Sequence, residues 1–174
     1  PSGVVEKVGA SVSGVRRGDR VIGQPVELLG DAARVSGIQT RERRFFGSSV
    51  DGVFREFYAA RGDQVHVVPR SFPLAESAIL ADAFSTPFYA LARRARIERG
   101  DWVAIIGVGG IGFPGAVMAM KMGARVVAID VNDWKLEAIT ARGAEAAIHI
   151  GKLAVDEERA RRDGRARAIA AAVA

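Results

Sequence analysis

A glycine-rich turn between two apolar runs constrains the fold of this chain more than any other feature. Residues 102–106 form an apolar run typical of a buried strand, and glycines follow at positions 107, 109 and 112. A second apolar run ends in Asp130, 18 residues after the last of these glycines. A strand, a Gly-x-Gly-x-x-Gly turn, a helix and an acidic strand end at this spacing predict a site for the pyrophosphate and ribose of a dinucleotide. A redox enzyme is therefore the first hypothesis.

Each glycine of the turn has a physical reason. Gly107 permits a tight turn after the strand, Gly109 lets the backbone approach a pyrophosphate, and Gly112 lets the following helix pack closely on the sheet. The N–H groups at the start of that helix would then face the phosphates. The alternative interpretation is a structural turn without a ligand, because glycine-rich turns are common.

Asp130 indicates which dinucleotide would bind. A carboxylate there can accept hydrogen bonds from both ribose hydroxyls and repels a 2′-phosphate, and the nearest following basic residue is Lys135. This pattern favours NAD over NADP. In the alternative interpretation, Asp130 caps a helix that starts near residue 133, a role that Asn132 or Asp133 could also take.

The two halves of the chain show different patterns. Residues 3–70 are β-rich, residues 24–50 show no clear period, and helical spacing begins near Ser71. We expect strands at 4–8, 20–23, 54–59, 64–68, 102–106, 126–129 and 146–150, and helices at 73–82, 85–95, 110–122, 134–142 and 153–173. The alternation after residue 100 predicts parallel strands joined by crossover helices, and a domain change near residue 83.

Composition excludes several classes of protein. The chain has no cysteine, which excludes disulfides and thiolate metal sites within it. Basic residues exceed acidic ones by five, but acidic residues are interleaved in the last basic cluster and no aromatic-basic pattern accompanies the arginines, so we expect no nucleic-acid binding. The uncharged run 103–120 contains five glycines and Pro114, so we expect no membrane span. The lack of cysteine agrees with a cytoplasmic protein, which we expect.

The two histidines carry no catalytic prediction. His66 and His149 both lie in strand-like runs, where packed or edge-strand residues are more common than catalysts. No Ser/His/Asp arrangement and no carboxylate pair is found, so no catalytic residue is assigned.

Several stretches in order resemble one family. The chain is similar to the medium-chain dehydrogenase/reductase superfamily, in particular its zinc-dependent alcohol dehydrogenase-like branch. The stretches that carry the resemblance are 2–9, 18–21, 47–57, 80–86, 100–112 and 130–136. The resemblance implies a partial β-rich GroES-like catalytic domain over residues 1–83. It also implies the first half of an α/β Rossmann-type NAD-binding domain over residues 84–174.

The resemblance also implies roles for individual residues. Backbone at Gly109, Gly110 and Ile111 would hold the pyrophosphate beside Gly107 and Gly112. Asp130 and Lys135 match the family's ribose-contacting pair. Thr86 matches a threonine that lies against the nicotinamide.

The chain departs from the family pattern at its metal sites. The cysteine and histidine ligands of the family's catalytic zinc would lie before Pro1, and the third ligand position holds Asp82. A carboxylate can bind zinc, so Asp82 is a candidate ligand, or a buried acid in a zinc-free relative. The family's four-cysteine lobe is absent, since residues 24–50 contain no Cys or His, and no structural zinc is expected.

We therefore expect an NAD(H)-dependent oxidoreductase that interconverts an alcohol and a carbonyl compound, assisted by zinc in the full-length protein. The stretch 80–87 is also similar to dehydrogenases of alicyclic hydroxyacyl-CoA thioesters, which makes a CoA thioester a candidate substrate. The alternatives are a zinc-free enoyl or quinone reductase of the same superfamily, or an NAD-binding relative without turnover. We interpret the chain as an internal piece of a longer homo-oligomeric protein, inactive by itself.

Overall fold

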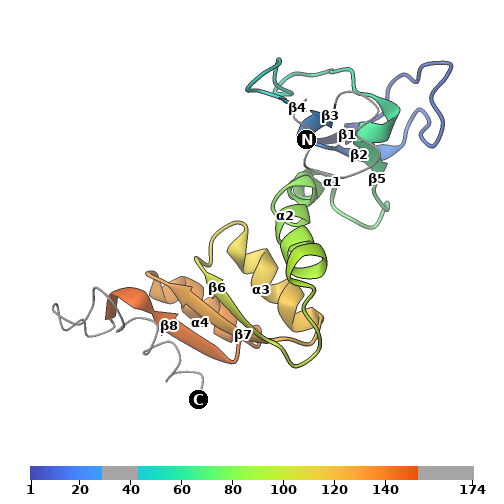
Figure 1. Cartoon of the computed structure of the whole chain (residues 1–174). Helices are drawn as coiled ribbons and strands as arrows, with labels where there is room; N and C mark the ends of the chain where they lie inside the picture. The colour runs from blue at the N-terminus through green and yellow to red at the C-terminus, as the bar shows by residue number, and fades with distance from the viewer. Residues whose placement is uncertain (29–42, 153–174) are drawn as a thin grey trace. The chain divides into compact units, whose positions relative to one another are not determined.

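Two compact units make up the chain, Pro1–Asp82 and Ala83–Ala174, here called the first and second units. The computed structural model describes residues 1–28 and 43–152 (Figure 1). The helix expected at 153–173 and much of the irregular segment lie outside these residues. No helix in the described ranges is long and apolar enough to cross a membrane.

The first unit is built on a small antiparallel sheet. Strand β2 (Arg20–Gly23) lies between β1 (Ser2–Val4) and β5 (Val65–Val67) and pairs with both in antiparallel fashion. The two positive-φ glycines 14 and 18 form the turns between β1 and β2, as the sequence predicts for this region. A 3₁₀ turn, η2 (Gly62–Gln64), leads into β5.

A second antiparallel pair corrects one expectation. Within the segment expected to be irregular, β3 (Val26–Leu28) pairs with β4 (Arg43–Phe45). Strands of three residues are too short to show a period of two in the sequence, so the pattern could not reveal them.

The strand expected at 54–59 is a further correction. This segment has no strand in the structure, and the side chain of Phe54 is fully exposed. A β-prone sequence becomes a strand only where a neighbouring strand offers a hydrogen-bond ladder, and none of the described strands pairs with it. The first unit then ends in α1 (Leu74–Ser77) and η3 (Ala78–Ala81).

The second unit begins with a helix and continues as a parallel sheet. The chain runs through α2 (Ser85–Tyr89) and the π-helical turn η4 (Ala90–Ala95), which ends at the left-handed residue Arg96. The sheet order is β6-β7-β8 with both pairs parallel, as the sequence predicts. Its elements are β6 (Trp102–Ile106), α3 (Gly112–Lys121), β7 (Arg125–Asp130), α4 (Asp133–Thr140), β8 (Ala146–His149) and η5 (Ile150–Lys152).

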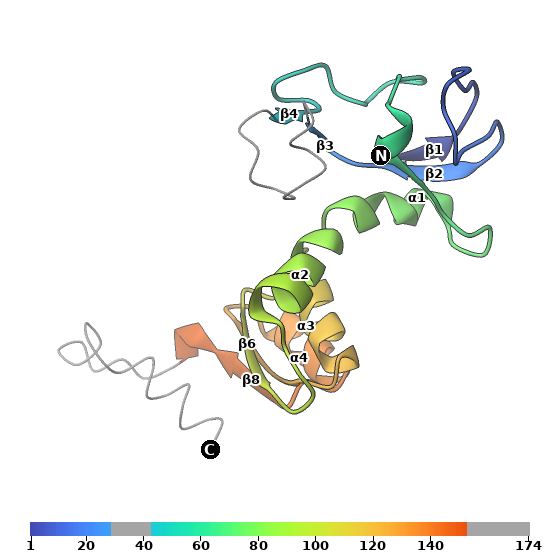
Figure 2. The ribbon, with the colours of Figure 1, turned by 45° about the vertical axis from the view of Figure 1, so that its right-hand side comes forward.

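The core of the second unit lies between the sheet and its helices. Helices α3 and α4 lie beside the sheet (Figure 2), and Ala116, Ala119 and Ile139 are fully buried against Val126 and Ala128 of β7. Residues of a strand alternate between its two faces. Strand β7 is buried on both faces, which explains its continuous apolar sequence.

Strand β6 is not the fully buried strand that its composition predicts. Val103 and Ile105 pack toward the core, but Ile106 on the other face is 80% exposed. In the described part of the chain, the core cluster covers only the face of β6 that carries Val103 and Ile105. An apolar run alone cannot tell which face has a neighbour.

The close approach of Gly112 to the Gly107 backbone can be tested by adding one carbon at position 112. A Cβ at Gly112 would collide with the backbone oxygen of Gly107 and lie 3.3 Å from Ile105 Cγ2, whereas a Cβ at Gly110 meets nothing within 4 Å. We expect Gly112→Ala to lower the free energy of unfolding by about 1–3 kcal/mol. Gly110→Ala, the matched control, should change it by less than about 0.5 kcal/mol.

The measurement is denaturant unfolding followed by tryptophan fluorescence. Both tryptophans, Trp102 and Trp134, belong to the second unit, so the signal reports on that unit alone. Equal stability of the two variants would contradict the steric argument.

Candidate functional site

The glycine turn lies at the carboxyl end of the parallel sheet. Gly107 follows β6 with a φ of 87°, a left-handed conformation that side chains rarely adopt. Its N–H donates to the oxygen of Ile129 at 2.8 Å, so β6 and β7 remain paired into the turn. The chain then reverses and enters α3 at Gly112, whose missing Cβ makes room for the Gly107 carbonyl.

Gly109 and Gly110 face open space. A Cβ at either position would meet no atom within 4 Å, so packing inside the described residues does not require glycine there. The next residue, Ile111, is the N-cap of α3 and is 47% exposed. The first N–H groups of a helix lack partners within the helix and carry its positive dipole end. A bare backbone in front of such a helix end is what close approach of an anion needs.

Asp130 ties this turn to the neighbouring one. The residue is 7% exposed, and its Oδ2 accepts a hydrogen bond from the N–H of Val108 at 2.7 Å. Its Oδ1 accepts from the N–H groups of Val131 and Asn132 at 2.8 and 2.9 Å, and from Asn132 Nδ2 at 3.0 Å. One carboxylate therefore holds the loop before α3 and the loop before α4 together.

These hydrogen bonds determine the charge of Asp130. Burial alone would raise the pKa of the carboxyl group, because burial penalises the charged form. The donors Val108, Asn132 and Val131 outweigh burial and lower the pKa from 3.8 to about 2. Asp130 is therefore ionised at neutral pH and places a negative charge beside the glycine turn.

Lys135 lies beside this carboxylate. Its Nζ is 3.7 Å from Asp130 Oδ2 and 5.6 Å from the centroid of the Trp134 ring. The Trp134 side chain is 68% exposed, so an aromatic surface and a cation lie at the same edge as the carboxylate. The structure thus brings Asp130 and Lys135 together, next to the turn that contains Gly107 to Gly112.

Thr86 belongs to the same unit as the turn. It lies in α2, one residue before the buried Pro87, and a Cβ added at Gly115 of α3 would come within 3.0 Å of the Pro87 side chain. Helix α2 therefore packs closely on the helix that leaves the glycine turn. The glycine at 115 is what permits this approach.

Asp82 is the last residue of the first unit. It follows η3, is exposed, and its N–H donates to the oxygen of Ile79 at 3.3 Å. In residues 1–28 and 43–152, no group of three or more His, Cys, Asp or Glu side chains is arranged to hold a metal ion. Asp82 is thus a single candidate ligand without a cluster around it in this part of the chain.

The two histidines lie in strands, as expected. His66 of β5 has its Nε2 2.9 Å from Gln24 Nε2. His149 ends β8 directly beside Asp130 in the register, with its Nε2 3.9 Å from Asp133 Oδ1.

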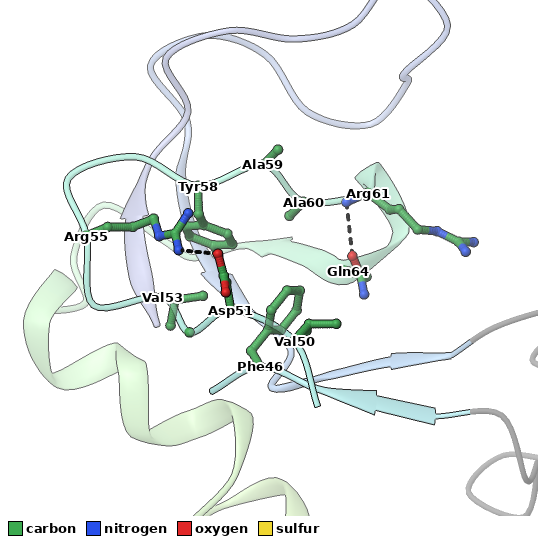
Figure 3. A pocket seen from close by; sticks show the side chains of 11 residues that line it. Phe46, Val50, Asp51, Val53, Arg55, Tyr58, Ala59, Ala60, Arg61 and Gln64 are labelled. Atoms are coloured by element: carbon green, nitrogen blue, oxygen red, sulfur yellow. Dashed lines mark hydrogen bonds and ion pairs between the residues drawn. The ribbon is translucent and has the colours of Figure 1, made fainter. Parts of the chain in front are cut away.

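A separate cavity of about 500 Å³ lies wholly within the first unit (Figure 3). Phe46, Val50 and Tyr58 supply apolar walls, and burial raises the pKa of the Tyr58 hydroxyl. At its side, Gln64 Oε1 accepts the N–H of Arg61 at 3.0 Å, while the buried Gln64 Nε2 has no hydrogen-bond partner in the described part of the chain. No residue of the glycine turn lines this cavity.

Two contacts of the site were missed by sequence reasoning. The Val108 N–H and the Asn132 side chain both bind Asp130, yet the sequence argument assigned Val108 no role and considered Asn132 only as a helix cap. The bond from the Asn132 backbone N–H to Asp130 Oδ1 had a signal, because Asp side chains often bond backbone two residues further on, and this bond brings the Asn132 side chain close to the carboxylate. The Val108 contact had none, since it joins residues 22 positions apart.

Comparisons with known proteins place this geometry in context. Residues 1–70 match the alcohol dehydrogenase GroES-like domain family. An alcohol dehydrogenase of Geobacillus stearothermophilus is 36% identical over 84% of this chain and 44% of its own length. An L-threonine 3-dehydrogenase of Anaeromyxobacter sp. is 32% identical over 86% of this chain and 44% of its own length.

Solved structures give the same picture. The alcohol dehydrogenase of the archaeon Aeropyrum pernix matches with a TM-score of 0.79 and 31% identity, covering 99% of this chain and 49% of that one. A protein of Sinorhizobium meliloti, described as a zinc-binding dehydrogenase bound to NADP, has a TM-score of 0.75 and 25% identity over 84% of this chain and 44% of its own. The chain thus spans just under half the length of these relatives, and its partial GroES-like and Rossmann-type folds are confirmed.

The low pKa of Asp130 predicts a pH dependence of stability. Because the folded pKa, about 2, lies below the ordinary 3.8, the stability from this carboxylate is present above the ordinary value and is lost as the pH falls toward 2. We expect the free energy of unfolding to fall less steeply between about pH 4 and pH 2 in Asp130→Asn than in the wild type.

Tryptophan fluorescence during denaturant unfolding at several pH values measures this difference. Glu137→Gln removes an exposed carboxylate of α4 in the same unit and serves as the control. If the free energy of unfolding depends on pH as steeply in Asp130→Asn as in the wild type, the low pKa assigned to Asp130 is contradicted.

Proposed function

We propose, from the premise that this chain belongs to the medium-chain dehydrogenase/reductase superfamily, that it supplies the dinucleotide site of an NAD(H)-dependent oxidoreductase. The protein would interconvert an alcohol and a carbonyl compound, in keeping with its similarity to alcohol dehydrogenases. The observation that carries the proposal is Asp130, an ionised carboxylate fixed at 2.7 Å to the backbone of the glycine turn.

The residues of the chain divide the work of binding. Backbone at Gly109, Gly110 and Ile111, just before α3, would bind the pyrophosphate, and the two glycines leave this backbone bare. Within the first turn of α3, Phe113 N–H already donates to the Gly109 oxygen and Pro114 has no N–H. Asp130 would accept hydrogen bonds from the ribose, and Lys135 would donate one beside it. Thr86, on the helix packed against α3, would lie toward the nicotinamide. These residues would hold an NAD that would supply the hydride acceptor for oxidation of the alcohol carbon.

Asp130 also gives the proposed preference for NAD a physical basis. A 2′-phosphate would bring a second negative charge next to a carboxylate that stays ionised down to about pH 2. Among the described residues, the cation that pairs with Asp130 is Lys135, whose Nζ is already 3.7 Å from Asp130 Oδ2. A phosphate placed against the Asp130 carboxylate would be strongly repelled where water is excluded, because charges are screened poorly there.

The zinc-assisted form of this reaction is a finer proposal. A zinc ion would polarise the substrate oxygen. Asp82 is the one candidate ligand in the described residues, and a single carboxylate does not form a zinc site, so no step through the metal is derived from this chain.

A zinc-free enoyl or quinone reductase of the same superfamily is the second candidate. The observation that favours it is Asp82 itself, because the position of the third zinc ligand holds a carboxylate and not the family's usual cysteine. The expected NADPH preference of such enzymes is disfavoured by Asp130, although a relative bound to NADP is among the similar structures.

A CoA thioester substrate and a homo-oligomeric assembly also stay predictions.

Cofactor binding tests the main proposal. The chain is titrated with NAD⁺ and with NADP⁺, and binding is followed by the fluorescence of the exposed Trp134. We expect NAD⁺ to bind at least about tenfold more tightly than NADP⁺, because NAD⁺ has no 2′-phosphate to repel Asp130. Asp130→Ser should weaken NAD⁺ binding and reduce the difference in affinity between NAD⁺ and NADP⁺. Glu137→Gln is the control. Equal affinities for both nucleotides in wild type and Asp130→Ser would refute the assignment.

Metal content tests the finer proposal. We expect the full-length protein to contain about one zinc per chain after gentle purification, measured by elemental analysis. Asp82→Ala should then lower the zinc content and leave NAD⁺ binding unchanged. A full-length protein without zinc, and with reductase activity on enoyl or quinone substrates, would favour the second candidate.

A further inference from the structure

We infer that Asn132 is a positioning residue of the dinucleotide site, whose side-chain amide fixes the orientation of Asp130 and thereby the preference for NAD over NADP. The inference rests on the proposed function and adds to it a residue that does not itself need to touch the cofactor.

The first observation is that Asn132 sits at a capping position without capping. It is the N-cap residue of α4, a place where asparagine is favoured because its side-chain oxygen accepts an N–H of the first helical turn. No such side-chain bond is present here. The amide nitrogen instead donates to Asp130 Oδ1 at 3.0 Å. The side chain therefore serves the neighbouring carboxylate and not the helix.

The second observation is how the acceptor sites of Asp130 are used. A carboxylate offers about four lone-pair directions, two on each oxygen. Oδ1 already receives three donors, all from residues 131 and 132. Oδ2 receives one, from Val108, and has Lys135 Nζ 3.7 Å away. The remaining acceptor capacity is therefore on Oδ2, the oxygen next to the glycine turn and the lysine.

The two carboxylate oxygens of Asp130 therefore have different roles. Oδ1 anchors the carboxylate to its own loop, and this anchoring holds Oδ2 toward Val108 and the approaching ribose. Without the Asn132 amide, two backbone donors remain on Oδ1 and the carboxyl group can rotate more freely. A rotated carboxylate loses its hold on Val108 and presents its charge less directly to a 2′-phosphate.

The chain offers a clean set of variants for this test. Asn132 is the only asparagine in the sequence, so its side-chain resonance is unique in NMR spectra. Asn132→Ala removes the amide, and Asn132→Ser keeps a shorter donor. Asp133→Ala is the matched control, because Asp133 lies in the same first turn and pairs with Lys152 but not with Asp130.

The first measurement needs no cofactor. Hydrogen exchange of the Val108 amide reports its bond to Asp130, and the Gly107 amide, bonded to Ile129 in the backbone ladder, is the internal reference. In Asn132→Ala we expect Val108 to exchange about three- to tenfold faster while Gly107 is unchanged. The exchange rate of Val108 in Asn132→Ser should lie between those of the wild type and Asn132→Ala. The rate in Asp133→Ala should match the wild type. Equal acceleration of both amides would show a merely structural role and overturn the inference.

The second measurement is nucleotide preference. In Asn132→Ala we expect NAD⁺ affinity to fall about five- to tenfold and NADP⁺ affinity to change less, so that the preference narrows. An unchanged preference together with unchanged Val108 exchange overturns the inference. If the wild type binds neither nucleotide, the proposed function fails, and the exchange measurement still decides whether Asn132 positions Asp130.

Discussion

The hydrogen bonds of one buried carboxylate hold the candidate site together. Asp130 ends the central strand of the parallel sheet, and its oxygens accept donors from both loops that follow the strands β6 and β7. A buried charge is tolerated only when donors replace the water it has lost. Each hydrogen bond to a charged group contributes roughly 1.5–3 kcal/mol, so the loops and the charge depend on each other.

Close backbone packing supplies the second constraint. The chain can reverse between β6 and α3 because Gly107 adopts a left-handed conformation and Gly112 has no Cβ where the Gly107 carbonyl lies. Gly115 in turn lets α2 approach through Pro87. These contacts explain three glycines, 107, 112 and 115, by the fold alone. At Gly109 and Gly110 an added Cβ would meet no atom within 4 Å among the described residues, so packing there does not require glycine.

The sequence predicted the second unit better than the first. In the second unit, apolar runs, helix periods and glycines all indicate the same alternation of strand and helix, and the boundaries agree within a few residues. In the first unit, strands of three or four residues carry little periodicity, so the pair β3–β4 was missed and a strand at 54–59 was wrongly expected. Sheet membership there depends on partners distant in the chain, which a local pattern does not contain.

The sequence by itself determined the order of elements in the second unit, the glycine turn and the acidic strand end, because these depend on local conformation and spacing. Only the tertiary structure decided that one face of β6 is exposed, that Oδ1 of Asp130 is occupied by its own loop, and that Val108 binds Oδ2. The reason is physical: residues 108 and 130 meet only after β6 and β7 pair in register, and the direction of a hydrogen bond follows from that pairing. A residue type states what a side chain can donate or accept, and the folded backbone determines with which partner it does so.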